Sequence, residues 1–158
     1  MRGWAGLLIL VAAAPLQAVE QGFGRWQQEV SQCLLQLESR RIDRCQGFRL
    51  DQRNEAVLRL SVLAPASMPG LIQELTFVGE LEPGSTAMRC RDGVCEIEAP
   101  MRLQLAVVRS AQFNGRGLVV GYPQTIPASG RCELSKTQVT CRDESSTGQL
   151  WSAQLNLR

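Results

Sequence analysis

The chain has 158 residues and a formal net charge of +2, from 17 Lys and Arg residues and 15 Asp and Glu residues. This near-balance argues against nucleic-acid binding, which needs a strong basic excess on one face. The sequence contains no histidine, and this excludes Ser-His-Asp and Cys-His nucleophilic sites as well as the commonest metal ligand. We therefore expect no nucleic-acid partner, no metal and no cofactor.

Residues 1–18 have the pattern of a secretory signal peptide. Arg2 gives a positive start, residues 4–14 form an apolar run, and Leu16-Gln17-Ala18 resembles a cleavage site. The run is shorter than the about 20 residues that a membrane-spanning helix needs. We expect a mature domain of residues 19–158, secreted or periplasmic, with no stable membrane span. The alternative is an uncleaved N-terminal anchor.

Residues 22–39 are predicted to form an amphipathic helix. Their apolar side chains recur three, four or seven residues apart, which is the spacing of one helix face. These side chains are Phe23, Trp26, Val30, Cys33, Leu34 and Leu37. We expect the stripe to pack on the rest of the domain, with Phe23 and Trp26 as core anchors rather than ligand-binding groups.

A run of arginines follows the predicted helix. Its members are Arg40, Arg41 and Arg44, with Arg49 and Arg53 beyond them. Guanidinium groups fixed at a helix end suit a phosphate, a sulfate or an acidic polymer. The first three are therefore our candidate anion- or partner-binding site. The alternative is that they complement the helix macrodipole and are otherwise solvated.

The apolar period changes to two after Cys45, which is typical of half-buried antiparallel strands. Apolar and polar side chains alternate in residues 56–62, 71–81, 101–107 and 151–157. Turn residues rich in Pro, Gly and Asn separate these segments. The predicted fold class is α+β but mostly β, with the N-terminal helix packed on an antiparallel β-sandwich or curved sheet of about seven or eight strands.

Two predicted hairpins carry four of the six cysteines. Asp92-Gly93 favours a type I′ turn, and a second turn is expected at Lys136-Thr137. Both turns bring a cysteine on one strand opposite a cysteine on the next, within disulfide range. The predicted disulfides are Cys90–Cys95, Cys132–Cys141 and, by elimination, Cys33–Cys45. Three disulfides indicate an oxidising compartment.

An internal repeat is a further possibility. The dipeptide Arg-Cys at 89–90 recurs 42 residues later, and so does Val-Gly at 78–79. Equal offsets suggest a duplicated strand–loop–hairpin unit. The alternative is chance recurrence of short dipeptides.

Catalytic candidates are few. Glu96 and Glu98 share a predicted strand face, so they could form an acid–base pair. A solvated face is the simpler interpretation, with Glu96 paired across the strands to Arg89. Ser135 and Lys136 could form a dyad, but a lysine in a turn is exposed and stays charged, which makes it a poor base.

Three functions fit these observations. The first is an exported, non-enzymatic binding or structural module, whose partner is an unknown protein, an anionic polymer or a lipid. The second is a carrier of an apolar or lipid-like ligand, which would enclose an apolar cavity of roughly several hundred Å³. The third is a hydrolase that uses carboxylates alone, which requires two converging acids and a raised pKa.

Overall fold

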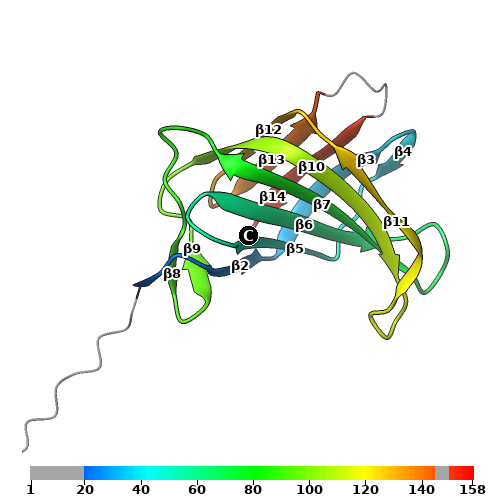
Figure 1. Cartoon of the computed structure of the whole chain (residues 1–158). Helices are drawn as coiled ribbons and strands as arrows, with labels where there is room; N and C mark the ends of the chain where they lie inside the picture. Colours follow the sequence, from blue (N-terminus) through cyan, green and yellow to red (C-terminus); the bar gives the residue numbers. More distant parts are fainter. Residues whose placement is uncertain (1–19, 145–149) are drawn as a thin grey trace, which may run out of the picture.

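The computed structural model describes residues 20–144 and 150–158, and the regular structure in these ranges is entirely β-strand (Figure 1). The predicted signal peptide lies outside the described residues. The strands are β1 (Glu20–Gln21), β2 (Gly24–Gln28), β3 (Val30–Leu37), β4 (Arg40–Ile42), β5 (Gly47–Gln52), β6 (Val57–Pro65), β7 (Ile72–Leu81), β8 (Arg89–Arg91), β9 (Val94–Glu96), β10 (Met101–Phe113), β11 (Val119–Pro127), β12 (Gly130–Leu134), β13 (Gln138–Asp143) and β14 (Trp151–Leu157). In these two ranges, no helix has the length and hydropathy needed to cross a membrane.

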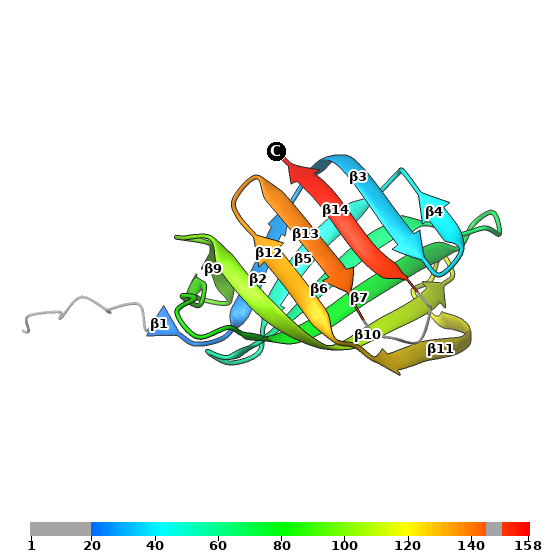
Figure 2. The ribbon, with the colours of Figure 1, turned by 90° about the horizontal axis from the view of Figure 1, so that it is seen from above.

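The strands form one sheet that curves back on itself. Their order is β1-β8-β9-β2-β5-β6-β7-β10-β12-β13-β14-β3-β4, and β11 pairs with β10 beside this path. Strands β2 and β3 lie far apart in that order, yet Glu29 alone separates them in the sequence. The chain therefore passes directly from one region of the sheet to the other. Figures 1 and 2 show that β12, β13, β14 and β3 lie over β5, β6 and β7 as a second layer.

The hydrophobic core lies between these two layers. Along β5, buried side chains alternate with partly exposed ones, as the period-two pattern predicts. Strand β6 follows the same pattern except at Ser61, which is buried as well. The completely buried side chains include Leu35, Leu50, Leu58, Leu60, Leu75, Phe77 and Leu103. Both layers contribute to this set, so each inward face is covered by the other layer.

The predicted helix at residues 22–39 is wrong, because these residues form β2 and β3. Trp26 faces the core from β2, and Leu35 and Leu37 face it from β3. The register of β3 against β14 shifts between Gln32 and Val30. This irregularity changes the phase of a period-two pattern, so that apolar residues fall three and four apart and imitate a helix. Pairing with β5 and β14 then determines the structure.

Phe23 also differs from its predicted role as a core anchor, because 56% of it is exposed. Trp26 does belong to the core, where its ring meets that of Phe48 edge-on at a centroid distance of 5.5 Å. Of the two predicted core anchors, Trp26 therefore lies in the interior and Phe23 lies on the surface.

The structure contains all three predicted disulfides, Cys33–Cys45, Cys90–Cys95 and Cys132–Cys141. The registers of both hairpins are confirmed as well. In the first hairpin, β8 and β9 pair Cys90 with Cys95 and Arg91 with Val94. In the second, β12 and β13 pair Cys132 with Cys141 and Leu134 with Val139. Three disulfides are consistent with an oxidising compartment.

The 42-residue repeat stays a prediction. Its two Val-Gly pairs fall on β7 and β11, but Gly79 is buried in the sheet and Gly121 is exposed. The two copies thus occupy different environments, whatever their origin.

Candidate anion-binding pocket

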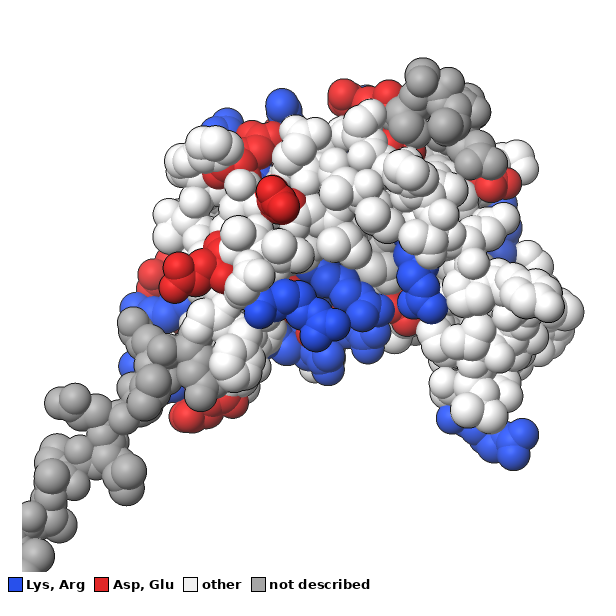
Figure 3. All heavy atoms as spheres, in the orientation of Figure 1, with Lys and Arg blue, Asp and Glu red and all other residues white. Residues whose placement is uncertain are grey.

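A pocket of about 900 Å³ opens on the outer face of the layer that contains β2, β5 and β6, beside the β8–β9 hairpin. Four arginines line it, namely Arg25, Arg49, Arg53 and Arg59, together with the carboxylates of Asp51 and Glu96. Figure 3 shows Lys and Arg side chains gathered in the middle of this face, between the end that carries β8 and β9 and the end that carries β11. We call this site the arginine pocket.

Strand alternation explains how these side chains come together. Arg49 and Asp51 alternate with the buried Phe48 and Leu50 on β5, so they point away from the core. Pairing of β5 with both neighbours sets Asp51 opposite Arg25 on β2 and opposite Arg59 on β6. Opposite charges facing each other across strands are mutually stabilising.

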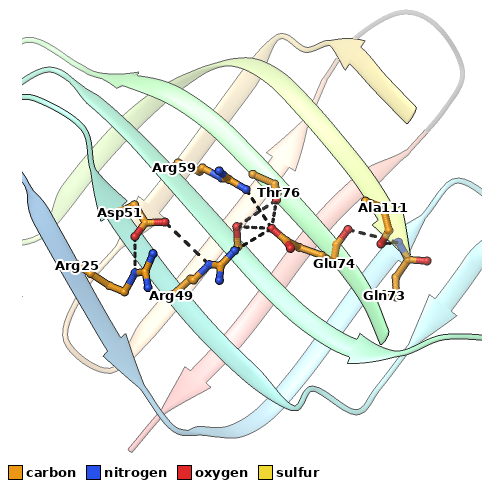
Figure 4. A network of polar contacts seen from close by, with 9 residues as sticks. Arg25, Arg49, Asp51, Arg59, Gln73, Glu74, Thr76 and Ala111 are labelled. Atoms are coloured by element: carbon orange, nitrogen blue, oxygen red, sulfur yellow. Dashed lines mark hydrogen bonds and ion pairs between the residues drawn. The ribbon is translucent and has the colours of Figure 1, made fainter. Parts of the chain in front are cut away.

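Glu74 on β7 binds the two central arginines. Its Oε1 lies 3.2 Å from Nη2 of Arg49 and 3.2 Å from Nη2 of Arg59. The hydroxyls of Ser61 and Thr76 donate to the same oxygen at 3.1 and 3.0 Å. Only 6% of the Glu74 side chain is exposed, against 28% of each arginine. Figure 4 shows the two guanidinium groups converging on this carboxylate from neighbouring strands.

The environment of Glu74 lowers its pKa below the ordinary value. Burial by itself would raise the pKa of this carboxyl, because it disfavours the charged form. The hydrogen bond from Thr76 and the charge of Arg49 act in the opposite direction, with further help from Ser61 and Arg59. Together they outweigh the burial, so Glu74 is ionised and holds two like charges side by side.

The arginines keep unused hydrogen-bonding capacity. Arg25 Nε donates to Asp51 Oδ1 at 2.5 Å, but Arg49 Nε lies 3.9 Å from the other oxygen of Asp51, beyond hydrogen-bond range. Among the described residues, the buried Nε atoms of Arg49 and Arg59 have no hydrogen-bond partner. Buried donors without a partner are uncommon in folded proteins, because each one costs free energy. Each of the two arginine side chains is also 28% exposed, so a guanidinium group that binds Glu74 still borders the pocket, where it can donate to the oxygen atoms of an anion.

The structure does not bring the sequence-predicted arginines into one site. Arg40 and Arg41 are consecutive on β4, so they point to opposite sides of the strand. Arg40 donates to the carbonyl oxygen of Pro65 at 3.1 Å, whereas Arg41 borders a separate pocket of about 540 Å³ near Asp43. Arg44 is exposed after the strand. Their role in binding stays a prediction, but its premise of a rigid helix end is wrong.

Arg49 and Arg53, from the same run in the sequence, do line the arginine pocket. Sequence reasoning missed Arg25 and Arg59, which come from other strands. The available signal was an arginine at an outward position of a period-two segment, as Arg59 is within residues 56–62. That signal identifies the face of the strand on which an arginine lies, but it does not identify the side chains on the neighbouring strands.

Three of the sequence-predicted catalytic candidates have different environments. Glu98 forms an ion pair, Ser135 hydrogen-bonds within its turn, and Glu96 lines the arginine pocket. Arg89 forms its ion pair with Glu98 at 2.7 Å, and not with Glu96, which lies opposite it on β9. Ser135 uses its hydroxyl in the turn, where it accepts a hydrogen bond from the Gln138 amide at 3.0 Å. Among the described residues, no group of three acidic or cysteine side chains could hold a metal ion.

No protein family model, curated protein or solved structure matches the chain. Function must therefore be inferred from the fold and from the chemistry of the pocket. The space between the two layers is occupied by the hydrophobic core. The arginine pocket opens beside that core, and Trp26 and Cys95 belong to both. It is larger than the pocket beside Arg41.

Proposed function

We propose that the protein is an exported, non-enzymatic binding module that takes an anionic partner into the arginine pocket. One observation carries the proposal: four arginines from three neighbouring segments line a single opening of about 900 Å³ with two carboxylates beside them. A guanidinium group suits oxyanions because it presents planar pairs of N–H donors and stays charged at all physiological pH values.

The rigidity of the site also supports binding. Arg49 and Arg59 are fixed by the buried carboxylate of Glu74, and Arg25 is fixed by Asp51. Side chains that are already ordered lose less conformational entropy when they bind a ligand. Export, to the periplasm or outside the cell, is proposed from the signal-peptide pattern and is supported by the three disulfides.

The other two functions stay predictions. The carrier would hold its ligand inside the curved sheet, and the residues of that interior form the core cluster. The carboxylate hydrolase would need Glu96 and Glu98 to converge, but Glu98 is engaged with Arg89. No feature of the described residues favours either function over the binding module.

The first prediction concerns the charge at the pocket rim. The double variant Arg25→Gln/Arg53→Gln should weaken the binding of tripolyphosphate at least about tenfold, since a hydrogen bond to a charged group contributes about 1.5–3 kcal/mol. Titration calorimetry at low ionic strength measures the affinity. Binding to the wild type should weaken as salt is added.

A matched control removes two charges elsewhere. Arg41→Gln/Arg44→Gln changes two exposed arginines outside the pocket and should leave the affinity unchanged. An equal loss in this control would show that net charge or the sequence-predicted cluster governs binding, and not the arginine pocket. Failure of the wild type to bind tripolyphosphate or any other anion would contradict the proposed function itself.

A further inference from the structure

Two exposed apolar side chains border the arginine pocket. Phe23 is 56% exposed and Val94 is 67% exposed, and both belong to the pocket lining. They come from different parts of the chain, the segment before β2 and the start of β9. Single exposed apolar residues are ordinary, but here two of them line one pocket that also contains four arginines.

The backbone holds both side chains in place. Strand β9 pairs in parallel with β2, where Arg25 lies opposite Val94, and the Arg25 amide donates to the Gly93 carbonyl oxygen at 2.8 Å. The Cys90–Cys95 disulfide closes the hairpin behind Val94. Gly24, next to Phe23, approaches this disulfide so closely that an added Cβ would lie 2.7 Å from Cys95 Sγ. The backbone that carries the apolar border is therefore held next to strand β2, which also carries Arg25.

We propose that the ligand of the arginine pocket is an amphiphilic anion, with an oxyanion headgroup on Arg49 and Arg59 and an alkyl or acyl chain against Phe23 and Val94. This inference rests on the proposed function and adds the apolar half of the ligand. An inorganic anion would use the guanidinium groups and leave the apolar border in water. A headgroup joined to a hydrocarbon chain satisfies both parts of the site.

Three probes separate the two halves of the ligand. Dodecyl phosphate, used below its critical micelle concentration, has both the anionic headgroup and the long chain. Ethyl phosphate has the same headgroup with a short chain. Dodecyl maltoside has the same long chain with a neutral headgroup. Dodecyl phosphate should bind at least about tenfold more tightly than ethyl phosphate, because each buried methylene adds to the affinity. Dodecyl maltoside should bind more weakly than dodecyl phosphate.

The outcomes distinguish this inference from the proposed function. Equal affinity for ethyl and dodecyl phosphate would overturn the amphiphile inference and leave anion binding intact. Equal affinity for dodecyl phosphate and dodecyl maltoside would show that charge is irrelevant, and would overturn both. Absence of binding by every phosphate would also overturn both.

Variants of the apolar border give an independent test. Phe23→Gln/Val94→Thr changes two exposed side chains and so should fold normally. It should reduce the affinity for dodecyl phosphate to that for ethyl phosphate, without changing the latter. The matched control Leu118→Gln/Val119→Thr, at exposed apolar positions where β11 begins, should change neither. A border variant that keeps the full preference for the long chain would overturn the inference.

The same chemistry occurs in free amphiphiles and in membrane lipids, so a second arm identifies the source. Vesicles of phosphatidylglycerol, with phosphatidylcholine vesicles as the neutral reference, are sedimented with the protein. Selective sedimentation with phosphatidylglycerol supports the inference with a membrane lipid as source. Tight binding of dodecyl phosphate without sedimentation supports it with a free amphiphile as source. If the variant Phe23→Gln/Val94→Thr sediments with phosphatidylglycerol vesicles as fully as the wild type does, the assigned site is contradicted.

Discussion

Glu74 illustrates how a single side chain can organise a surface site. Its carboxylate accepts hydrogen bonds from four donors, and two of these donors are charged guanidinium groups. Without this carboxylate, the two guanidinium groups would repel each other. Arg49 and Arg59 are one strand apart, and their mutual repulsion is offset by the negative charge between them. The acid therefore acts as a positioning residue for the arginine pocket.

Replacing this acid tests that role. Glu74→Gln has almost the same shape and should lower the free energy of unfolding at pH 7 by about 2–3 kcal/mol, because two arginines lose their buried counter-charge. Urea unfolding followed by tryptophan fluorescence measures it. Glu80→Gln, at an exposed position of the same strand, should stay within about 0.5 kcal/mol of the wild type.

The pH dependence follows from the lowered pKa of Glu74. The unfolded chain has the ordinary value of about 4.3, so the folded protein binds this proton less readily than the unfolded chain does. The stabilisation is complete above the unfolded pKa and is lost as the pH falls through the folded pKa. The stability gap between wild type and Glu74→Gln should thus narrow below about pH 4. A gap that widens in acid would contradict this assignment.

Gly79 is required by a close approach between two strands. A Cβ at this position would lie 2.5 Å from the carbonyl oxygen of Gln104, beside the irregularity in β10. Gly79→Ala should therefore destabilise the protein by about 1–3 kcal/mol. In the control Gly47→Ala, the nearest atom to the new methyl group is a Leu63 carbon at 3.8 Å, an ordinary contact. Thermal unfolding of both variants should show a lowered midpoint for Gly79→Ala alone.

At the scale of the elements, the two disulfide hairpins differ from the third disulfide in accessibility. Cys132 and Cys141 are completely buried in the core, whereas Cys33 and Cys45 are partly buried at its border. Reduction requires the attacking thiolate or phosphine to reach a sulfur atom, so exposure controls the rate in the folded protein.

We expect Cys33–Cys45 to be reduced first under native conditions and Cys132–Cys141 to resist until the protein unfolds. Timed treatment with a reductant, alkylation of the released thiols and peptide mapping give the order. In denaturant, where all six cysteines are accessible, the difference should disappear. Early labelling of Cys132 would show that the second hairpin opens more readily than its burial implies.

Local signals were sufficient for the hairpins. Asp92-Gly93 indicated the turn, and the register then placed Cys90 opposite Cys95 without knowledge of any other strand. The strand segments after Cys45 were predictable for a similar reason, because period two is a local pattern. The segment 22–39 was not, because its pattern is broken by a register shift whose position depends on β14, at the opposite end of the chain.

The arginine pocket could be predicted only in part. Arg49 and Arg53 were visible as members of a basic run, but Arg25 and Arg59 join them through the pairing of β2, β5 and β6. Alternation gives the face on which a side chain lies, whereas the neighbouring side chain depends on strand order and register. In the sequence alone, Glu74 is one polar residue in a predicted strand. Its contact with the arginines becomes apparent only from the pairing of β7 with β6.

At the scale of the whole molecule, the described residues place stability and binding in different regions, the interior and one outer face. The core between the two layers supplies stability, and the arginine pocket lies on the outer surface of one layer. A ligand at this pocket would contact strands that the core already holds in position. Binding therefore does not require the layers to separate.

The passage from β2 to β3 through Glu29 has a consequence for how the chain folds. Strand β2 pairs with β5 nearby in sequence, but β3 pairs with β14, so that Cys33 lies opposite Leu155. A chain made from its N-terminus must complete almost its whole length before β3 finds this neighbour. Such distant pairings raise the contact order and slow folding. A Cys33–Cys45 disulfide formed before that pairing would keep β3 close to its short partner β4 and would limit the search for the final strand.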